Sequence, residues 1–275
     1  MPASPARGET PERPPVLLRQ TQGSIAVLTL NRPEARNSLS ERLIGELHAA
    51  IDAAGADPAI RAVVIAASGP AFSSGHDLKE LTAHRADPDR GRAYFAHVMT
   101  ICSAMMQAIV QLPKPVVACV QGVATAAGCQ LVATCDLAVA SEKARFATPG
   151  VDIGLFCSTP MVALTRNIAR KHAMEMLLTG EPVDAAAAQR MGLINRVVAD
   201  GRERDAALDL AQKVARKSAY VVKLGKAAFY RQAEMNLADA YRYAAAVMTE
   251  NMMARDAEEG IDAFIEKRDP TWKDR

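Results

Sequence analysis

The fold is decided by an uncharged stretch at residues 115–135, P-V-V-A-C-V-Q-G-V-A-T-A-A-G-C-Q-L-V-A-T-C. Its length alone would suit a membrane span, but Gln121 and Gln130 do not suit a helix exposed to lipid. An apolar run that breaks at Gly122 is typical of a strand buried on both faces, followed by a tight turn and a buried helix. We therefore predict a buried strand at 116–120 with a helix after the turn.

Strands and helices alternate on both sides of this stretch. Ser38 or Ser40 caps a helix of regularly spaced apolar residues, and a longer helix fills 88–111. Short β-rich runs lie at 16–19, 25–30, 61–66, 116–120 and 137–140. The first two runs are separated by T-Q-G-S, which predicts a hairpin. The alternation predicts an α/β fold with layered βαβ units, and the segment 72–78 is expected to be a loop.

The last third of the chain has a different, helical pattern. Helices are predicted at 174–178, 185–191, 204–217, 221–235, 238–252 and 256–267, with one short strand at 194–198. We therefore divide the chain into a disordered leader at 1–15, an α/β core at 16–200 and a helical C-terminal region at 201–275.

Composition argues against several classes of partner. The 33 basic residues nearly balance the 31 acidic ones, so the net charge of +2 gives no reason to expect nucleic acid or a membrane surface. The five cysteines form no C-x-x-C pair, which favours free thiols in a reducing compartment over disulfides or zinc. The leader has no apolar segment, and Glu9 and Glu12 argue against a mitochondrial signal. We therefore expect a cytoplasmic location.

Two loops after buried strands carry the candidate chemistry, F-S-S-G-H-D-L at 72–78 and Q-G-V-A-T-A-A-G-C-Q at 121–130. Small residues let a ligand approach the backbone, and N–H groups at a helix start lack an intrahelical partner. One N–H from each loop could hold a carbonyl oxygen, as in an oxyanion hole for a thioester enolate. The alternative is that both loops are only tight connections between a strand and a helix and bind no ligand. A dinucleotide-binding site or a P-loop is a weaker interpretation of the second loop, because neither G-x-G-x-x-G nor a phosphate-binding lysine is present.

Short motifs then occur in a characteristic order. They are N-R-P at 31–33 with Asn37, F-S-S-G-H-D-L at 72–78, P-K-P-V at 113–116, G-V-A-T-A-A-G-C at 122–129, C-D-L-A at 135–138, F-A-T-P at 146–149, L-T-G at 178–180 and A-x-x-x-G-L-I-N-x-V at 188–197. This series resembles the enoyl-CoA hydratase/isomerase (crotonase) family over about residues 16–270. The H-D-L-K-E-L-T, A-T-A-A-G-C-Q and G-L-F-C-S-T-P segments look most like the subgroup called enoyl-CoA hydratase domain-containing protein 3.

The resemblance implies a crotonase-like spiral of ββα units, with C-terminal helices that mediate assembly into a homotrimer or a dimer of trimers. Members bind acyl-CoA thioesters, and by motif position the two carbonyl-binding N–H groups would come from His76 and Ala127. Ala126 and Ala127 stand where glycines are common in the family. Alanine keeps a backbone N–H, so the oxyanion hole can persist if Ala127 has helical dihedral angles. Coenzyme A would enter as part of the substrate, and neither a permanently bound cofactor nor a metal is expected.

The same resemblance implies contacts to coenzyme A from Ala35, Arg36, Ser73, Ser74, His76 and Asp77. Lys223 and Lys226 match a basic C-terminal helix that can reach the CoA phosphates. The alternative for both lysines is an ordinary solvated helix face.

The chain departs from the family at both glutamates that hydratases use. Gln130 stands at the first position, where an amide can orient water but cannot take its proton at neutral pH. Gly150 stands at the second and has no side chain. Because each positioned acid or base contributes roughly 10²–10⁴-fold to rate, we expect very little conventional hydration.

No other carboxylate replaces them by motif position. Cys157 and Ser158 stand where some relatives carry an aspartate, and Asp152, His76 and Glu80 are weaker candidates for an acid or base. The first hypothesis is therefore an enzyme that stabilises a thioester enolate. The alternatives are a non-catalytic acyl-CoA-binding protein, or another CoA-thioester reaction such as isomerisation, hydrolysis or decarboxylation.

Overall fold

The computed structural model describes residues 14–275 and begins with the expected hairpin. Strands β1 (Leu17–Gln22) and β2 (Ile25–Leu30) pair antiparallel, with Gln22 opposite Ile25. The turn places Gly23 at a φ of +59°, which a residue without Cβ adopts without strain. Helix α1 (Glu41–Ala56) follows, and the hydroxyl of Ser40 caps it by accepting from Leu43 N–H.

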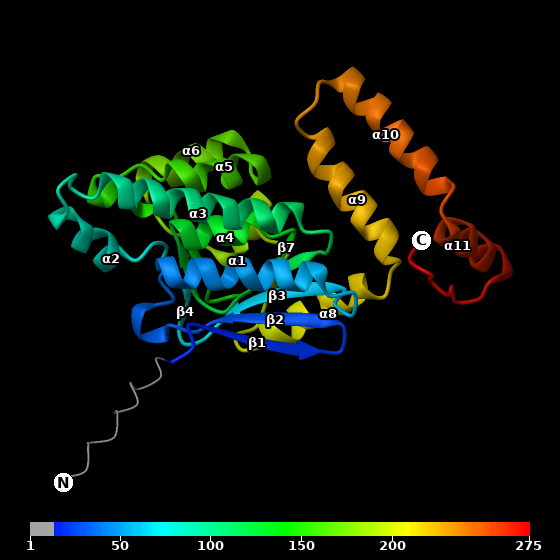
Figure 1. Ribbon diagram of the computed structural model, residues 1–275, viewed down its shortest axis with the longest axis horizontal. Coiled ribbons are helices and arrows are strands. Elements are labelled where there is room, and N and C mark those ends of the chain that lie inside the picture. The colour runs from blue at the N-terminus through cyan, green and yellow to red at the C-terminus, as the bar shows by residue number, and fades with distance from the viewer. Residues whose placement is uncertain (1–13) are drawn as a thin grey trace, which may run out of the picture.

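A six-stranded sheet forms the centre of the molecule in the order β1-β2-β3-β5-β7-β10. The added strands are β3 (Ala62–Ala67), β5 (Val116–Val120), β7 (Leu137–Ser141) and β10 (Arg196–Val198), all parallel to β2. Helices α1 and α3 (Arg92–Gln111) lie on one side and α8 (Glu203–Ala215) on the other (Figure 1). Burial on both faces explains why these parallel strands are continuously apolar.

A second, four-stranded sheet has the order β4-β6-β8-β9. Its strands are β4 (Ala71–Ser73), β6 (Val123–Thr125), β8 (Arg145–Ala147) and β9 (Val183–Asp184). The first three each follow a strand of the large sheet, so the chain winds as a spiral of ββα units, as the resemblance implied. The expectation that 72–78 is only a loop is wrong at both ends, because β4 pairs with β6 and α2 (Leu78–Ala83) begins at Leu78.

The stretch at 115–135 lies in the core as strand β5, short strand β6 and helix α4 (Ala127–Thr134), and every residue of α4 is buried. Helices α5 (Ser158–Asn167), α6 (Arg170–Thr179) and α7 (Ala185–Met191) complete this part. Among residues 14–275, α3 alone is long and apolar enough to span a membrane by length and composition. It packs between α1 and α4, with Val98, Met105 and Ile109 buried.

The C-terminal region is helical, as predicted, but its helices differ in how they pack. The buried face of α8, with Ala207 and Ala211, covers the large sheet. Helices α9 (Ala219–Gln232), α10 (Leu237–Met252) and α11 (Arg255–Glu266) instead extend beyond the sheet (Figure 1). By packing, α8 therefore belongs with the core.

Candidate active site

The two candidate loops are in van der Waals contact. A Cβ added to Gly128 would lie 2.2 Å from the carbonyl oxygen of Ser73. A Cβ added to Gly75 would lie 2.8 Å from Cβ of Ala126 and 3.1 Å from the backbone nitrogen of Ala127. Glycine at 75 and 128 therefore allows the first loop to approach the start of α4 this closely.

The backbone N–H groups of His76 and Ala127 at this contact have no acceptor within residues 14–275, and neither do those of Gly128 and Cys129, the next two residues of α4. Ala127 is the first residue of α4, so its N–H belongs to the positive end of a helix. The helical conformation that the Ala127 donor requires is therefore present. The strain falls on Ala126, which has a φ of +51° where glycine would be unstrained.

A buried amide holds the first loop in place. The side chain of Asn37 is fully buried and donates to the carbonyls of Ser68 and Ala71, while its oxygen accepts from Arg32 N–H. The hydroxyl of Ser73 donates to the carbonyl of Asn37 at 2.9 Å. These bonds fix the backbone around Ser73 before any ligand arrives.

Six of the residues predicted to contact coenzyme A, Ala35, Arg36, Ser73, Ser74, His76 and Asp77, lie on or beside the first loop. Ser74 N–H donates to the carbonyl of Arg36 at 3.0 Å, which joins the exposed Arg36 and its neighbour Ala35 to the first loop. Asp77 caps α2 and forms an ion pair with Arg32 at 2.8 Å. Burial opposes ionisation of Asp77, but hydrogen bonds from Arg32, the backbone of Glu80 and Ser38 hold its pKa below the ordinary value.

The imidazole of His76 is largely buried, and its Nε2 atom has no hydrogen-bond partner among the described residues. Burial lowers the pKa of His76, because the charged form loses hydration. The ring is therefore neutral at physiological pH, and its buried Nε2 atom stays without a partner among the described residues.

Gln130 lies one turn along α4 from Ala127 and is 5% exposed. Its Oε1 atom is buried without a hydrogen-bond partner. The residue lines a cavity of about 530 Å³ between α3, α4, α5 and α9. A glutamine side chain has two N–H donors and one carbonyl acceptor.

Gly150 is enclosed by the segment that follows it. A Cβ at this position would lie 2.8 Å from the carbonyl oxygen of Leu155 and 2.9 Å from Sγ of Cys157. Burial raises the pKa of the Cys157 thiol, so the group beside Gly150 is a neutral thiol. The second glutamate position therefore has neither a carboxylate nor free space for one.

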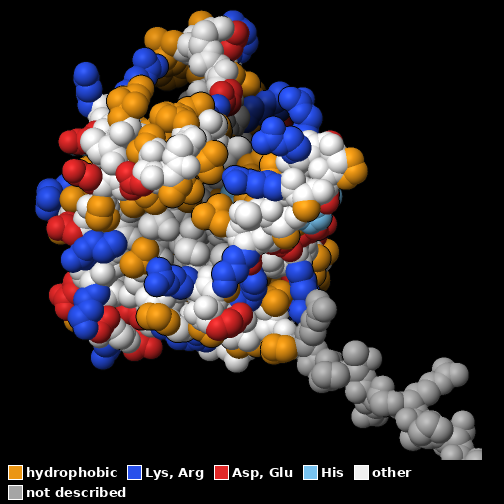
Figure 2. Space-filling view, turned by 90° about the vertical axis from the view of Figure 1, so that its left-hand side faces the viewer, with side chains coloured by type: hydrophobic (Ala, Val, Ile, Leu, Met, Phe, Trp, Pro, Cys, Tyr) orange, Lys and Arg blue, Asp and Glu red, His pale blue; other side chains and the backbone are white. Residues whose placement is uncertain are grey.

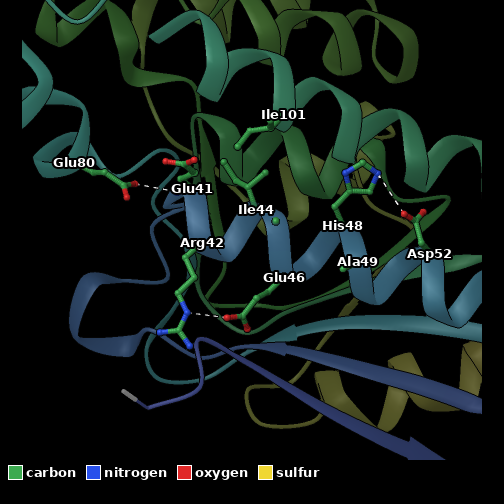
Figure 3. A pocket seen from close by; sticks show the side chains of 10 residues that line it. Glu41, Arg42, Ile44, Glu46, His48, Ala49, Asp52, Glu80 and Ile101 are labelled. Carbon is green, nitrogen blue, oxygen red and sulfur yellow. Dashed lines mark hydrogen bonds and ion pairs between the residues drawn. The ribbon is translucent and has the colours of Figure 1, made fainter. Parts of the chain in front are cut away.

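Two other acidic candidates point elsewhere. Glu80 accepts from Glu41 N–H at 2.9 Å and lines an open groove of about 760 Å³ on the outer face of α1, below Ile101 of α3 (Figure 3). Apart from Glu80, none of the candidate site residues lines this groove. Asp152 is exposed, with Oδ2 3.1 Å from where a Cβ on Gly180 would lie.

Lys226 is already paired inside the protein, a feature that the sequence did not reveal. Its ammonium forms an ion pair with Asp136 at 2.6 Å and donates to the carbonyls of Ile109 and Lys114, which gives each of its hydrogens an acceptor. Its side chain is only 8% exposed, so a solvated helix face is the wrong description. A CoA contact from Lys226 stays a prediction that requires breaking this pair, whereas Lys223 is more accessible.

Comparisons with known proteins agree with this fold. The family model described as enoyl-CoA hydratase/isomerase matches residues 20–275. Enoyl-CoA hydratase domain-containing protein 3, mitochondrial, from Rattus norvegicus is 48% identical over 97% of this chain and 88% of its own length. The crystal structure of enoyl-CoA hydratase from Mycobacterium smegmatis superposes with a TM-score of 0.89 at 50% identity and covers 94% of this chain and 99% of that one. The human enoyl-CoA hydratase domain-containing protein 3 structure also gives 0.89, at 46% identity over 94% of this chain and 100% of its own.

The names of relatives correct one expectation. The similar rat and human proteins are both named mitochondrial. The expectation of a cytoplasmic location is therefore wrong. It rested on Glu9 and Glu12 of the leader, which lie outside residues 14–275.

The motif order, the spiral of ββα units and the match over residues 20–275 lead to one conclusion. The chain belongs to the enoyl-CoA hydratase/isomerase family, and within it is similar to enoyl-CoA hydratase domain-containing protein 3.

Proposed function

We propose that this protein binds acyl-CoA thioesters and stabilises the enolate of the bound thioester between the N–H groups of His76 and Ala127. The observation that carries the proposal is that both N–H groups lack an acceptor within residues 14–275 and lie on two loops in direct contact. Donors that are fixed before charge develops stabilise an oxyanion without reorganisation. Coenzyme A would enter as part of the substrate.

Efficient hydration is not part of this proposal. Gln130 cannot accept a proton from water at neutral pH, and Gly150 is packed against Leu155 and Cys157. These two positions favour a second candidate, a non-catalytic acyl-CoA-binding protein. Another reaction of a CoA thioester would need an acid or base from outside the family's motif positions.

Assembly into a homotrimer or a dimer of trimers is proposed from exposed apolar side chains. Ile153, Leu155 and Phe156 are 44–59% exposed after β8, and Leu237 and Phe264 are 75% and 85% exposed on α10 and α11. Apolar side chains also gather on the upper part of the face in Figure 2, with lysines and arginines below them. Large exposed apolar patches mark interaction surfaces. Analytical ultracentrifugation tests this, and a monomer at all concentrations would contradict it.

Acetoacetyl-CoA tests the enolate proposal, because its enolate absorbs in the near ultraviolet and reports stabilisation of the negative charge. We expect the wild type to increase this absorbance at neutral pH. Ala127→Pro removes the N–H at a first helical position, where proline is tolerated, and should abolish the increase. Ala127→Gly keeps the N–H and should retain it.

The outcomes separate the candidates. Acetoacetyl-CoA binding by calorimetry without an enolate band would favour the non-catalytic binding protein. An enolate band that survives in a folded Ala127→Pro variant would contradict the assigned donor. Absence of binding by any acyl-CoA would contradict the whole proposal.

A further inference from the structure

Helix α2 begins just after the His76 donor and has little packing of its own. None of its six residues is fully buried, and Leu78 is 51% exposed. A short element with few buried apolar contacts opens easily unless hydrogen bonds hold it. The position of the segment at 76–83 therefore depends on the bonds that join it to the rest of the protein.

Leu39 holds the backbone on both sides of His76. Its N–H donates to the carbonyl of Gly75 at 2.8 Å, and its carbonyl accepts from Asp77 N–H at 3.2 Å. These two bonds make Leu39 and His76 a parallel bridge pair. Because successive peptide groups of an extended segment point in opposite directions, the N–H of His76 points away from Leu39, and it has no acceptor within residues 14–275.

Glu80 forms the second link between the same two segments. Its Oε2 atom accepts from Glu41 N–H at 2.9 Å, so the side chain reaches from the first turn of α2 to the first residue of α1 (Figure 3). This N–H has no partner within its own helix, and the positive end of a helix favours a carboxylate. Helix α2 is thus tied at its first turn by Glu80 and at its cap by the ion pair of Asp77 with Arg32.

The two links close a ring that contains the donor. Leu39 closely precedes Glu41, and Glu80 closely follows His76. The backbone of Leu39 fixes one end of the ring, and the Glu80 carboxylate fixes the other. Loss of the Glu80 bond opens the ring, so the peptide group that carries the His76 N–H gains freedom to rotate. A donor stabilises an oxyanion well only when its orientation is fixed before charge develops.

We propose that Glu80 is a positioning residue for the His76 donor, because its carboxylate ties α2 to α1 and so fixes the backbone that presents the His76 N–H. This inference rests on the proposed function, in which that N–H meets the oxygen of the thioester enolate. Glu80 acts through the backbone and transfers no proton.

Ser40 supplies a matched control, because it caps the same helix without a link to α2. Its hydroxyl accepts from Leu43 N–H at 3.2 Å and makes no hydrogen bond to the segment 76–83. Ser40→Ala and Glu80→Ala therefore each remove one cap of α1, but only the second variant opens the ring. Glu80→Gln removes the negative charge and keeps an oxygen that can accept from Glu41 N–H.

The pH midpoint at which bound acetoacetyl-CoA forms its enolate measures the strength of the donors. Because removing an oxyanion donor outright costs about 10²–10³-fold, we expect the misaligned donor of Glu80→Ala to raise this midpoint by about one pH unit, a roughly tenfold weaker stabilisation. Loss of a nearby negative charge would instead favour the enolate and lower the midpoint, so charge alone does not produce the expected rise. Glu80→Gln and Ser40→Ala should not raise the midpoint. Butyryl-CoA, whose carbonyl stays uncharged, should bind all four proteins with similar affinity.

Hydrogen exchange of the ligand-free protein tests the same link separately. The amides of 76–83 should exchange faster in Glu80→Ala than in the wild type, and at the wild-type rate in Ser40→Ala. An unchanged exchange rate in Glu80→Ala, or an equal rise of the midpoint in Glu80→Ala and Ser40→Ala, would overturn the inference alone. Absence of an enolate band in the wild type would instead remove the proposed function, and with it the assigned role of Glu80.

Discussion

Gly128→Ala tests whether close contact between the two loops builds the site. The added Cβ would lie 2.2 Å from the carbonyl oxygen of Ser73 and 2.8 Å from its carbonyl carbon. Ser73 cannot turn away, because β4 pairs with β6 and its hydroxyl is bonded to Asn37. The loops must therefore separate by about 1 Å to reach ordinary contact distance.

Two effects should follow from this separation. Overpacking of this kind costs about 1–3 kcal/mol, which corresponds to a fall in Tm of roughly 2–12 °C for a chain of this size. The donors on His76 and Ala127 would also move apart, and a displacement of about 1 Å in a site can reduce rates about 10²-fold. We therefore expect the acetoacetyl-CoA enolate band to be lost.

Differential scanning calorimetry and the enolate absorbance measure the two effects on the same sample. The control is Gly45→Ala in α1, where an added Cβ meets no atom within 4 Å. Alanine there should stabilise the helix by about 0.5–1 kcal/mol and leave the band unchanged. An unchanged Tm and an unchanged band in Gly128→Ala would show that close contact between the two loops does not build the site.

Four further predictions concern stability. Ala126→Gly should raise Tm because it relieves a positive φ worth about 1 kcal/mol. Gly150→Ala should lower Tm because its Cβ meets backbone and sulfur at 2.8–2.9 Å, and a neutral result in thermal melts would contradict that packing. Lys226→Met should cost up to about 3–5 kcal/mol in urea titrations, because the largely buried Asp136 loses its counter-ion and keeps only the hydrogen bonds from Val116 N–H and the Tyr230 hydroxyl. Lys213→Met, in an exposed pair, should cost below about 1 kcal/mol. Because burial lowers the pKa of His76 below 6.5, the unfolded chain binds more protons, and stability should fall as pH drops from about 6.5 toward the lower folded pKa; His76→Gln should remove that part of the loss.

The sequence was sufficient for the longer elements of the fold. Apolar runs long enough to show a period predicted the hairpin, α1, α3 and the buried strand β5, and Ser40 marked the start of α1. Strands β4, β6 and β8 have three residues each, too few to show alternation, so the second sheet appeared only through the family resemblance. Helix α5 was also missed in the sequence.

The candidate site was predictable in its backbone but not in its side chains. Motif order indicated that the loops around His76 and Ala127 meet, and the structure brings them together. The partner of Lys226 could not be found, because Asp136 lies 90 residues away and pairing depends on how α9 packs. Likewise, a glycine at 150 shows only that a glutamate is missing, whereas its contact with Cys157 shows that the space is filled.

We propose that the site holds acyl-CoA thioesters but lacks the acid–base groups for efficient hydration. The most direct test is turnover of crotonyl-CoA and longer 2-enoyl-CoAs, followed by loss of the conjugated-thioester absorbance, with acyl-CoA binding measured on the same sample. We expect acyl-CoA binding together with a hydration rate at least about 10²-fold lower than in a relative that carries both glutamates. Rapid turnover that is lost in Gln130→Ala or His76→Ala would contradict it and identify the group that replaces the missing carboxylates.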